Sequence, residues 1–109
     1  MSDEQTSSAA VQSLSALLQY QTGAIVSRVL LKNKGGTVTL FAFDEGEGLS
    51  EHTAPFEALV LVIDGEAEVE IAGKAHHVSA GETITLPANV PHAVRAATRF
   101  KMMLTMLRA

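Results

Sequence analysis

Residues 46–65, GEGLSEHTAPFEALVLVIDG, and residues 81–96, GETITLPANVPHAVRA, decide the fold of this chain. Each stretch opens on a glycine and continues into residues that favour β-strands. Each also places one histidine near the expected end of a strand, His52 in the first stretch and His92 in the second. These two histidines are therefore the first candidates for a functional role.

Short strands and turns account for the sequence on both sides of these stretches. Residues 66–71 alternate between glutamates and apolar side chains, which is typical of a strand with one face in water. Glycines supply the turns, as in the connection over residues 32–36. With one short helix at the edge, the pattern predicts an all-β barrel or sandwich. The expected strands are 25–31, 37–43, 58–63, 66–71, 75–78, 83–86, 93–97 and 100–107.

The chain divides into three parts by composition. Residues 1–8 are polar and are expected to form a disordered tail, residues 9–24 form an N-terminal helix and lead-in, and residues 25–109 form the barrel. The helix is predicted over residues 9–20 because apolar residues recur there at helical spacing. A serine before it can serve as the N-cap, and a glycine follows it. The apolar positions are Val11, Leu14, Leu17 and Leu18, the N-cap is Ser7 or Ser8, and the glycine is Gly23.

Two of the expected strands are apolar on both faces. They are ALVLVI at residues 58–63 and MMLTML at residues 102–107. One face lines the barrel, and the other needs a cover because an exposed apolar strand face promotes aggregation. We expect the N-terminal helix to cover part of that face and a twofold partner to cover the rest, which predicts a homodimer.

The composition argues against several classes of protein. The 109 residues carry a formal net charge of −4, and their Lys and Arg residues are scattered, so neither nucleic acid nor a membrane surface is an expected partner. Without cysteine, a disulfide, an iron–sulfur cluster or a thiol nucleophile is ruled out. The polar start is unlike a signal peptide, and no apolar run reaches the ~18–20 residues that span a bilayer. We expect a soluble, cytoplasmic protein.

The first stretch resembles the first metal-binding motif of the cupins. Gly46 is followed after five residues by His52, and Gly65 closes the motif at the family's distance. The family's second histidine and its glutamate fall on Ala54 and Ala58. Neither alanine can ligate a metal, so the resemblance implies a motif that has lost two of its donors.

The second stretch resembles the second cupin motif. Gly81, Pro87 and His92 match it, and Asn89 takes the place of a glycine, since asparagine also accepts a left-handed backbone. The resemblance covers about residues 25–107. It implies a cupin-type double-stranded β-helix, a jelly-roll barrel, with a short N-terminal helix.

The resemblance also implies a metal inside the barrel, since the family's histidines and glutamate converge on one ion. Iron, manganese, nickel or zinc would then be held by His52, His92 and a third ligand, for which Glu57 is the nearest candidate. Strand parity turns Glu57 away from the histidines, but a bulge at Pro55 would rotate it inward. Such a site would serve a metal-dependent oxygenase or isomerase.

A barrel without a full metal site is the interpretation we prefer. Two alanines in place of metal ligands enlarge and dry the pocket, which favours a small, partly apolar organic ligand. A barrel that only dimerises is a third alternative, and the two histidines make it less attractive. The expected ligand pocket consists of His52, Ala54, Phe56, Ala58 and His92.

Overall fold

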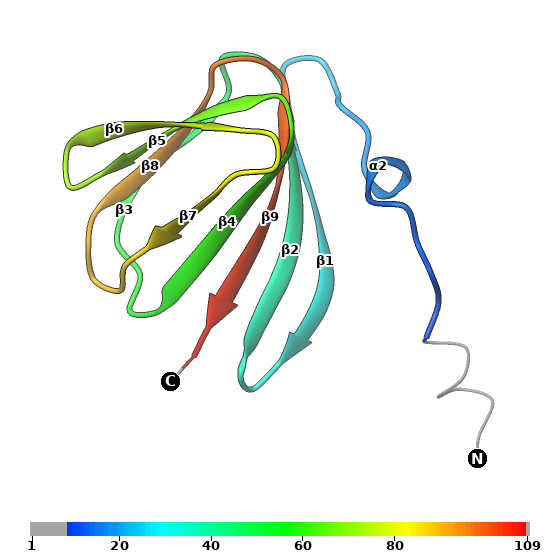
Figure 1. Cartoon of the computed structure of the whole chain (residues 1–109), viewed down its shortest axis with the longest axis horizontal. Coiled ribbons are helices and arrows are strands. Elements are labelled where there is room, and N and C mark those ends of the chain that lie inside the picture. Colours follow the sequence, from blue (N-terminus) through cyan, green and yellow to red (C-terminus); the bar gives the residue numbers. More distant parts are fainter. Residues whose placement is uncertain (1–8, 109) are drawn as a thin grey trace.

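The computed structural model describes residues 9–108 of the chain. The expected tail, with its N-cap at Ser7 or Ser8, lies outside these residues. The described part contains one short helix and nine strands (Figure 1). The helix is α2 (Leu14–Leu17), and the strands are β1 (Ile25–Asn33), β2 (Gly36–Phe43), β3 (Gly48–His52), β4 (Glu57–Asp64), β5 (Glu66–Ile71), β6 (Lys74–Ser79), β7 (Thr83–Leu86), β8 (His92–Ala96) and β9 (Phe100–Leu107). Strand β3 is one that the sequence pattern does not predict.

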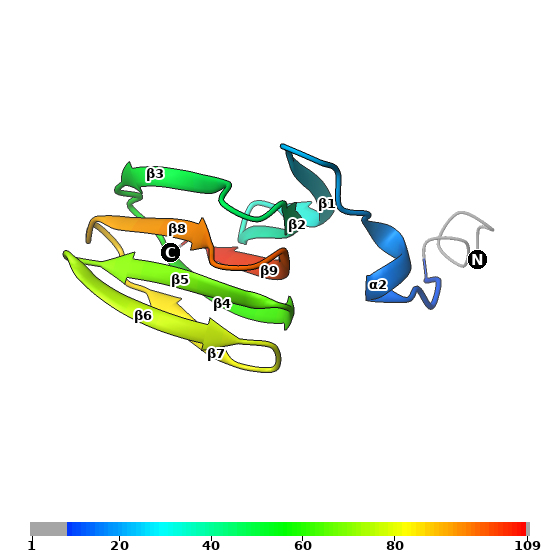
Figure 2. The ribbon, with the colours of Figure 1, turned by 90° about the horizontal axis from the view of Figure 1, so that it is seen from above.

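The strands form two antiparallel sheets that enclose the core. The first sheet has the order β1-β2-β9-β4-β7, and the second has the order β3-β8-β5-β6. From β3 onward the chain passes repeatedly from one sheet to the other, which is the winding of a jelly roll and confirms the predicted fold class. Figure 2 shows helix α2 beside the barrel, outside both sheets. The largest fully buried side chains are Phe43, Phe100, Met102, Val60, Val62 and Val69.

Gly65 shows why the first stretch must end on a glycine. It joins β4 in the first sheet to β5 in the second, and its φ of +73° lies in the left-handed region. A Cβ atom at this position would lie 1.9 Å from the carbonyl oxygen of Arg99. The crossing between the sheets therefore requires a residue without a side chain.

The N-terminal helix is shorter than predicted. It spans only Leu14–Leu17, whereas the apolar spacing predicts a helix over residues 9–20. Leu18 is already extended, with φ −149°, and it is buried. A helix of two or three turns is marginal by itself, so the burial of extended residues against the barrel outweighs the helical spacing.

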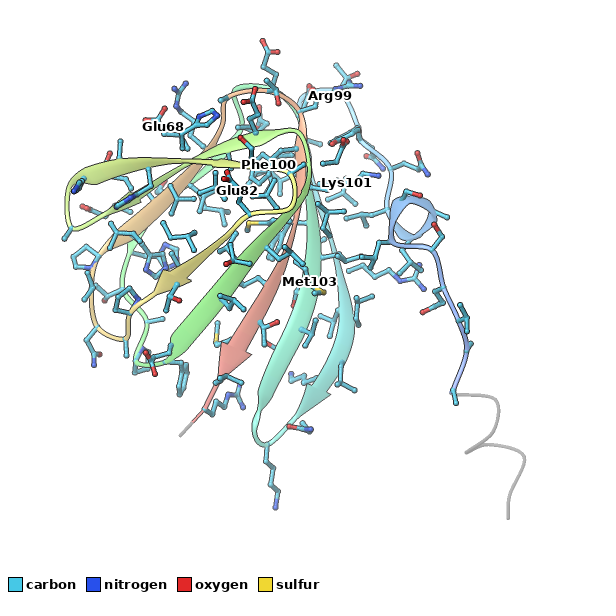
Figure 3. All side chains as sticks on the ribbon, viewed as in Figure 1. Glu68, Glu82, Arg99, Phe100, Lys101 and Met103 are labelled. Carbon is cyan, nitrogen blue, oxygen red and sulfur yellow. The ribbon has the colours of Figure 1, made fainter. Side chains whose placement is uncertain are left out.

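Residues 15–23, the N-terminal strap, cover part of the outer face of the first sheet. Leu18 is buried there in a second apolar cluster with Leu40 and Ala42, and Met103 packs against it. Figure 3 shows Met103 on the side of β9 that faces the strap, with Phe100 between the two sheets. The N-terminal segment thus provides the partial cover that the two-faced apolar strands lead us to expect.

Two carboxylates anchor the strap. Tyr20 donates a hydrogen bond to Asp64, and its ring lies 5.5 Å from the guanidinium of Arg99. Asp44 accepts a hydrogen bond from the Gly23 amide at 2.6 Å and another from Arg99 Nε at 2.7 Å. These donors lower the pKa of Asp44 to about 2, while burial and the bond to Asp64 raise the pKa of Tyr20. The strap is therefore fixed by polar contacts as well as by apolar packing.

Candidate functional site

A bulge in β3 turns His52 toward His92. Leu49 pairs with Val94, and the next pair along the two strands is His52 with His92. Two residues on β3 thus oppose a single residue on β8, which is the arrangement of a β-bulge. Without the extra residue, Glu51 would share the inward face with Leu49. The bulge places His52 on that face instead.

Strand β8 carries His92 into the barrel. His92, Val94 and Ala96 are buried at alternate positions of the strand, so their side chains share its inner face. His92 is only 6% exposed, and it is the one buried polar or charged residue among those described. His52 is exposed, so the pair connects the interior of the barrel to its surface.

The two imidazole rings meet through their Nε2 atoms. These atoms lie 3.1 Å apart, and the rings are arranged edge to face with their centroids 4.3 Å apart. On the far side of each ring, Nδ1 contacts a backbone carbonyl: Ser50 O at 2.8 Å for His52 and Val90 O at 3.2 Å for His92. Each ring is therefore held by the carbonyl two residues before it in the chain while it touches the other ring.

The pair is one proton short of satisfying these contacts. A carbonyl oxygen only accepts, so each Nδ1 must carry a proton to hydrogen-bond to it. A neutral imidazole has one N–H, so both Nε2 atoms then present lone pairs to each other. The contact at 3.1 Å needs a third proton, or a donor from another molecule, to become attractive. The two rings thus form a site that accepts a donor.

Two loops hold the ends of β3 and β8 together beside the pair. The amide of Asn89, in the loop after β7, donates a hydrogen bond to the carbonyl of Ala54 at 2.7 Å. Asn89 has φ +64°, the left-handed conformation expected where the cupin motif has a glycine. This bond lies two residues beyond His52 and three before His92, so it helps fix both rings.

The three other predicted pocket residues lie near this junction. Ala58 is 8% exposed and shares the inner face of β4 with Val60 and Val62. Ala54 and Phe56 are half-buried. Phe56 lines a hollow of about 610 Å³ at the rim of the barrel, the mouth hollow, which His52 and His92 do not line. The mouth hollow is lined by Pro55, Phe56, Glu57, Pro87, Ala88, Leu107 and Arg108.

Glu57 does not join the histidines. It is exposed, and it pairs with Leu107 in a register that runs without a shift as far as Val62. Because Ala58 faces inward, its neighbour Glu57 faces outward, and the inward rotation that a bulge at Pro55 would produce does not occur. Within residues 9–108, no three His, Cys, Asp or Glu side chains come close enough to hold a metal ion.

The residues present therefore do not fit the metal that the cupin motifs imply. Ala54 and Ala58 offer no donor atom, and two imidazoles are fewer than the three protein ligands of a catalytic zinc or a non-haem iron site. A metal-dependent oxygenase or isomerase built on His52, His92 and Glu57 lacks its third ligand in this arrangement.

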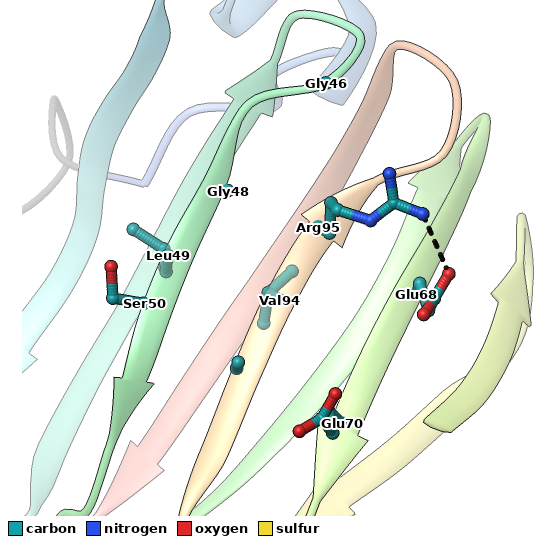
Figure 4. Close-up of a pocket in the computed structure, with 9 residues that line it drawn as sticks. Gly46, Gly48, Leu49, Ser50, Glu68, Glu70, Val94 and Arg95 are labelled. Atoms are coloured by element: carbon teal, nitrogen blue, oxygen red, sulfur yellow. Dashed lines mark hydrogen bonds and ion pairs between the residues drawn. The ribbon is translucent and has the colours of Figure 1, made fainter. Parts of the chain in front are cut away.

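A shallow hollow on the outer face of the second sheet is a feature that sequence reasoning missed. It has a volume of about 300 Å³ and lies over β3, β8 and β5 (Figure 4). Its charged side chains are Glu68, Glu70 and Arg95, and Arg95 forms an ion pair with Glu68 at 3.1 Å. Cross-strand partners become visible only once the strand order is known, so no signal in the sequence could have identified this hollow.

The adjacent histidines His76 and His77 lie away from the pair. They are on β6, at the edge of the second sheet. His77 is exposed and forms an ion pair with Glu66 at 2.8 Å. His76 is half-buried, on the same face of β6 as the buried Val78.

The fold and the histidine pair define a small jelly-roll barrel with fewer metal-donor side chains than the cupin motifs imply. Comparison with known proteins identifies its family. Residues 39–107 match the Cupin domain family. This match covers more than half of the chain, so the protein belongs to the cupin family, as its two motifs predict. No curated protein matches the chain significantly. The described residues contain no helix that is long and apolar enough to cross a membrane.

Several solved structures share this fold. A conserved protein of unknown function from Streptococcus pyogenes is 31% identical, with a TM-score of 0.88 over 93% of this chain and 89% of that one. A cupin superfamily protein from Desulfitobacterium hafniense is 26% identical, with a TM-score of 0.84 over 88% of each chain. A Cupin 2 conserved barrel domain protein from Leptotrichia buccalis is 42% identical, with a TM-score of 0.84 over 87% of this chain and 46% of that one. These names assign the fold and the family without a ligand or a reaction.

Proposed function

We propose that this cupin binds a small, partly apolar organic ligand inside the barrel, oriented by His52 and His92 and without a full metal site. The observation that carries the proposal is the Nε2–Nε2 contact of 3.1 Å between rings whose Nδ1 atoms both face carbonyl oxygens. Two lone pairs that converge on one point are completed by a hydroxyl or N–H group of a ligand.

The surroundings of the pair favour a ligand with an apolar body. Ala58 lies on the inner face of β4, and Leu49 and Val94 share the inner faces of β3 and β8 with the two histidines. Glu57, the carboxylate nearest in sequence, faces outward. A charged ligand would lose its hydration in such a lining without gaining a counter-ion, whereas a neutral donor on a carbon skeleton would not.

The mouth hollow is the route by which we expect the ligand to enter. Its lining begins at Pro55, three residues after His52, and includes Ala88, four residues before His92. Phe56 contributes an aromatic wall to it, and the guanidinium of Arg108 lies 5.6 Å from the Phe56 ring. A half-buried ring beside an exposed cation suits the passage of a partly apolar molecule.

A thermal-shift screen with small sugars, alcohols, amides and carboxylates tests the proposal. We expect at least one hydroxyl or amide compound to raise the melting temperature of the wild type, and we expect His52→Ala and His92→Ala to weaken its binding at least tenfold. His77→Ala is the matched control, because it removes an exposed histidine from the other edge of the sheet. Binding that survives both His52→Ala and His92→Ala, or no response across the panel, would overturn the proposal.

Two further predictions from the sequence accompany this proposal. The outer face of the first sheet remains apolar beyond the N-terminal strap, which supports a homodimer as the working form. A cytoplasmic location is our expectation, and the absence of cysteine agrees with it.

A further inference from the structure

The exposed large apolar side chains of the described residues gather in two places. Val11 and Leu14 lie on the N-terminal arm, residues 9–14, and Val11 is fully exposed. The other four are on strands of the first sheet: Val29, Leu31, Leu59 and Leu107, which are 58%, 62%, 43% and 61% exposed. Scattered apolar residues are normal on a protein surface, but two concentrated groups call for a physical explanation.

The strand register joins three of these residues into one patch. Leu31 pairs with Val38, Val38 with Thr105, and Thr105 with Leu59, so a row of outward side chains crosses β1, β2, β9 and β4. Leu107 lies in the next row on the same face, opposite Gly36 and Glu57. We call Leu31, Val38, Leu59 and Leu107 the apolar patch.

The apolar patch is flanked by hollows that could receive the side chains of a docked segment. Leu107 lies between two hollows, one of about 250 Å³ toward β1 and β2 and one of about 170 Å³ toward β4 and β7. Of the residues that line these two hollows, only Glu57 is charged. An apolar segment could therefore lie across the patch without burying an unpaired charge.

The N-terminal strap covers the neighbouring part of the same face. The carbonyl of Leu17 accepts a hydrogen bond from Arg28, and the carbonyl of Ser15 accepts one from Lys101, both at 3.3 Å. These bonds fix the strap beside its own sheet, and the arm that precedes it extends away from the barrel (Figure 1). The arm thus leaves its own apolar patch uncovered.

We propose that the N-terminal arm of one copy lies across the apolar patch of a second copy, and that the exchange is reciprocal. The arm, Ala-Ala-Val-Gln-Ser-Leu, is uncharged and carries the apolar side chains that lack a cover in its own chain. A twofold dimer places each arm against the patch of the other copy with the same contacts twice.

The length of the arm suits this role. The five residues of the arm that precede α2, residues 9–13, span up to ~17 Å when extended, and the three intervals between β1 and β4 span roughly 14 Å at the ordinary strand spacing. The arm can therefore cross the whole row from Leu31 to Leu59. One exchange covers Val11 and Leu14 of the arm together with Leu31, Leu59 and Leu107 of the patch. It does not involve the histidine pair, although Leu107 also lines the mouth hollow.

Cysteine cross-linking tests the exchange directly, because the chain contains no cysteine of its own. Val11→Cys and Leu59→Cys are made as separate variants, mixed and oxidised. We expect a disulfide-linked dimer that contains one chain of each kind. Val11→Cys mixed with Ala75→Cys, at an exposed site on β6 in the other sheet, is the control and should give no dimer above background.

The double variant Val11→Cys/Leu59→Cys separates exchange from folding back. We expect it to form covalent dimers, whereas a disulfide within one chain would show that the arm covers its own patch and would overturn the proposal. The oligomeric state gives a second measurement that does not depend on disulfide chemistry. The wild type should be a dimer by light scattering, and Leu59→Glu should shift it to a monomer with an unchanged circular dichroism spectrum. A monomeric wild type would also overturn the proposal.

Discussion

Restoring the two missing donors should turn the histidine pair into a metal site. In the double variant Ala54→His/Ala58→Glu, the new side chains occupy the positions where the cupin motif has its second histidine and its glutamate. Ala58 faces the interior and is 8% exposed, so a glutamate there is buried. His92 is buried in the same barrel, and His52 is 3.1 Å from it. The variant therefore supplies two imidazoles, a third nitrogen donor and a carboxylate.

The expected loss of unfolding free energy follows from the burial of Ala58. Overpacking and an unpaired buried carboxylate each cost about 1–3 kcal/mol, so we expect the metal-free variant to lose about 3 kcal/mol of unfolding free energy. At roughly 4–8 °C per kcal/mol for a domain of this size, its melting temperature should fall by about 12–24 °C. A divalent metal at a hundredfold excess over its dissociation constant returns about 2.7 kcal/mol, which is nearly the whole loss.

Thermal unfolding with and without manganese, nickel or zinc measures this effect. The wild type should respond weakly, and the double variant should recover most of its melting temperature. Adding His92→Ala should abolish the recovery, while adding Glu57→Gln should not, because Glu57 faces outward. If the folded double variant gains no more from metal than the wild type does, the assignment of Ala54 and Ala58 to the site is refuted. A recovery that depends on Glu57 would refute the strand parity.

Three further predictions concern the fold that carries the site. Gly65→Ala should lower the unfolding free energy, measured by urea denaturation, by at least about 2 kcal/mol. The left-handed backbone is strained by a side chain, and the new Cβ would lie 1.9 Å from a carbonyl oxygen. An unchanged denaturation midpoint would contradict the close crossing of the chain at this position. The lowered pKa of Asp44, about 2 against an ordinary 3.8, favours the folded state above pH ~4, and this contribution should fade as the pH falls to 2; Asp44→Asn should flatten that part of the stability curve. The raised pKa of Tyr20 favours the folded state below pH 10, and this contribution should be lost as the pH rises further. When each protein is compared with its own stability at pH 8, alkaline unfolding should therefore begin at a lower pH in the wild type than in Tyr20→Phe.

The barrel could be predicted from the sequence because its signals are local. Alternation in residues 66–71 and glycine turns at known intervals depend on near neighbours in the chain, and the structure has strands at these places. The need for glycine at a particular position also has a physical cause, because a side chain at Gly65 would clash with a backbone carbonyl where the chain crosses between the sheets. The N-terminal helix was harder to predict, since Leu18 is extended only because it packs on a sheet that is distant in sequence.

The candidate site was predictable in part. Motif spacing gave His52 and His92, and the structure brings them together. The bulge before His52 could not be foreseen, because a bulge is defined by the partner strand and not by the residues that form it. The number of protons that the pair needs could not be foreseen either, because it depends on how each Nδ1 contacts the carbonyl two residues before it. Glu57 illustrates the opposite case, in which simple parity gave the observed outward direction and the bulge considered at Pro55 is not needed.

The metal content of protein purified without an affinity tag is the most direct test of the central claim. We predict far less than one equivalent of iron, manganese, nickel or zinc per chain, with no difference between the wild type and His92→Ala. One equivalent in the wild type that disappears in His92→Ala would show that His52 and His92 ligate an ion, and it would contradict the account of the pair as an acceptor site for an organic ligand.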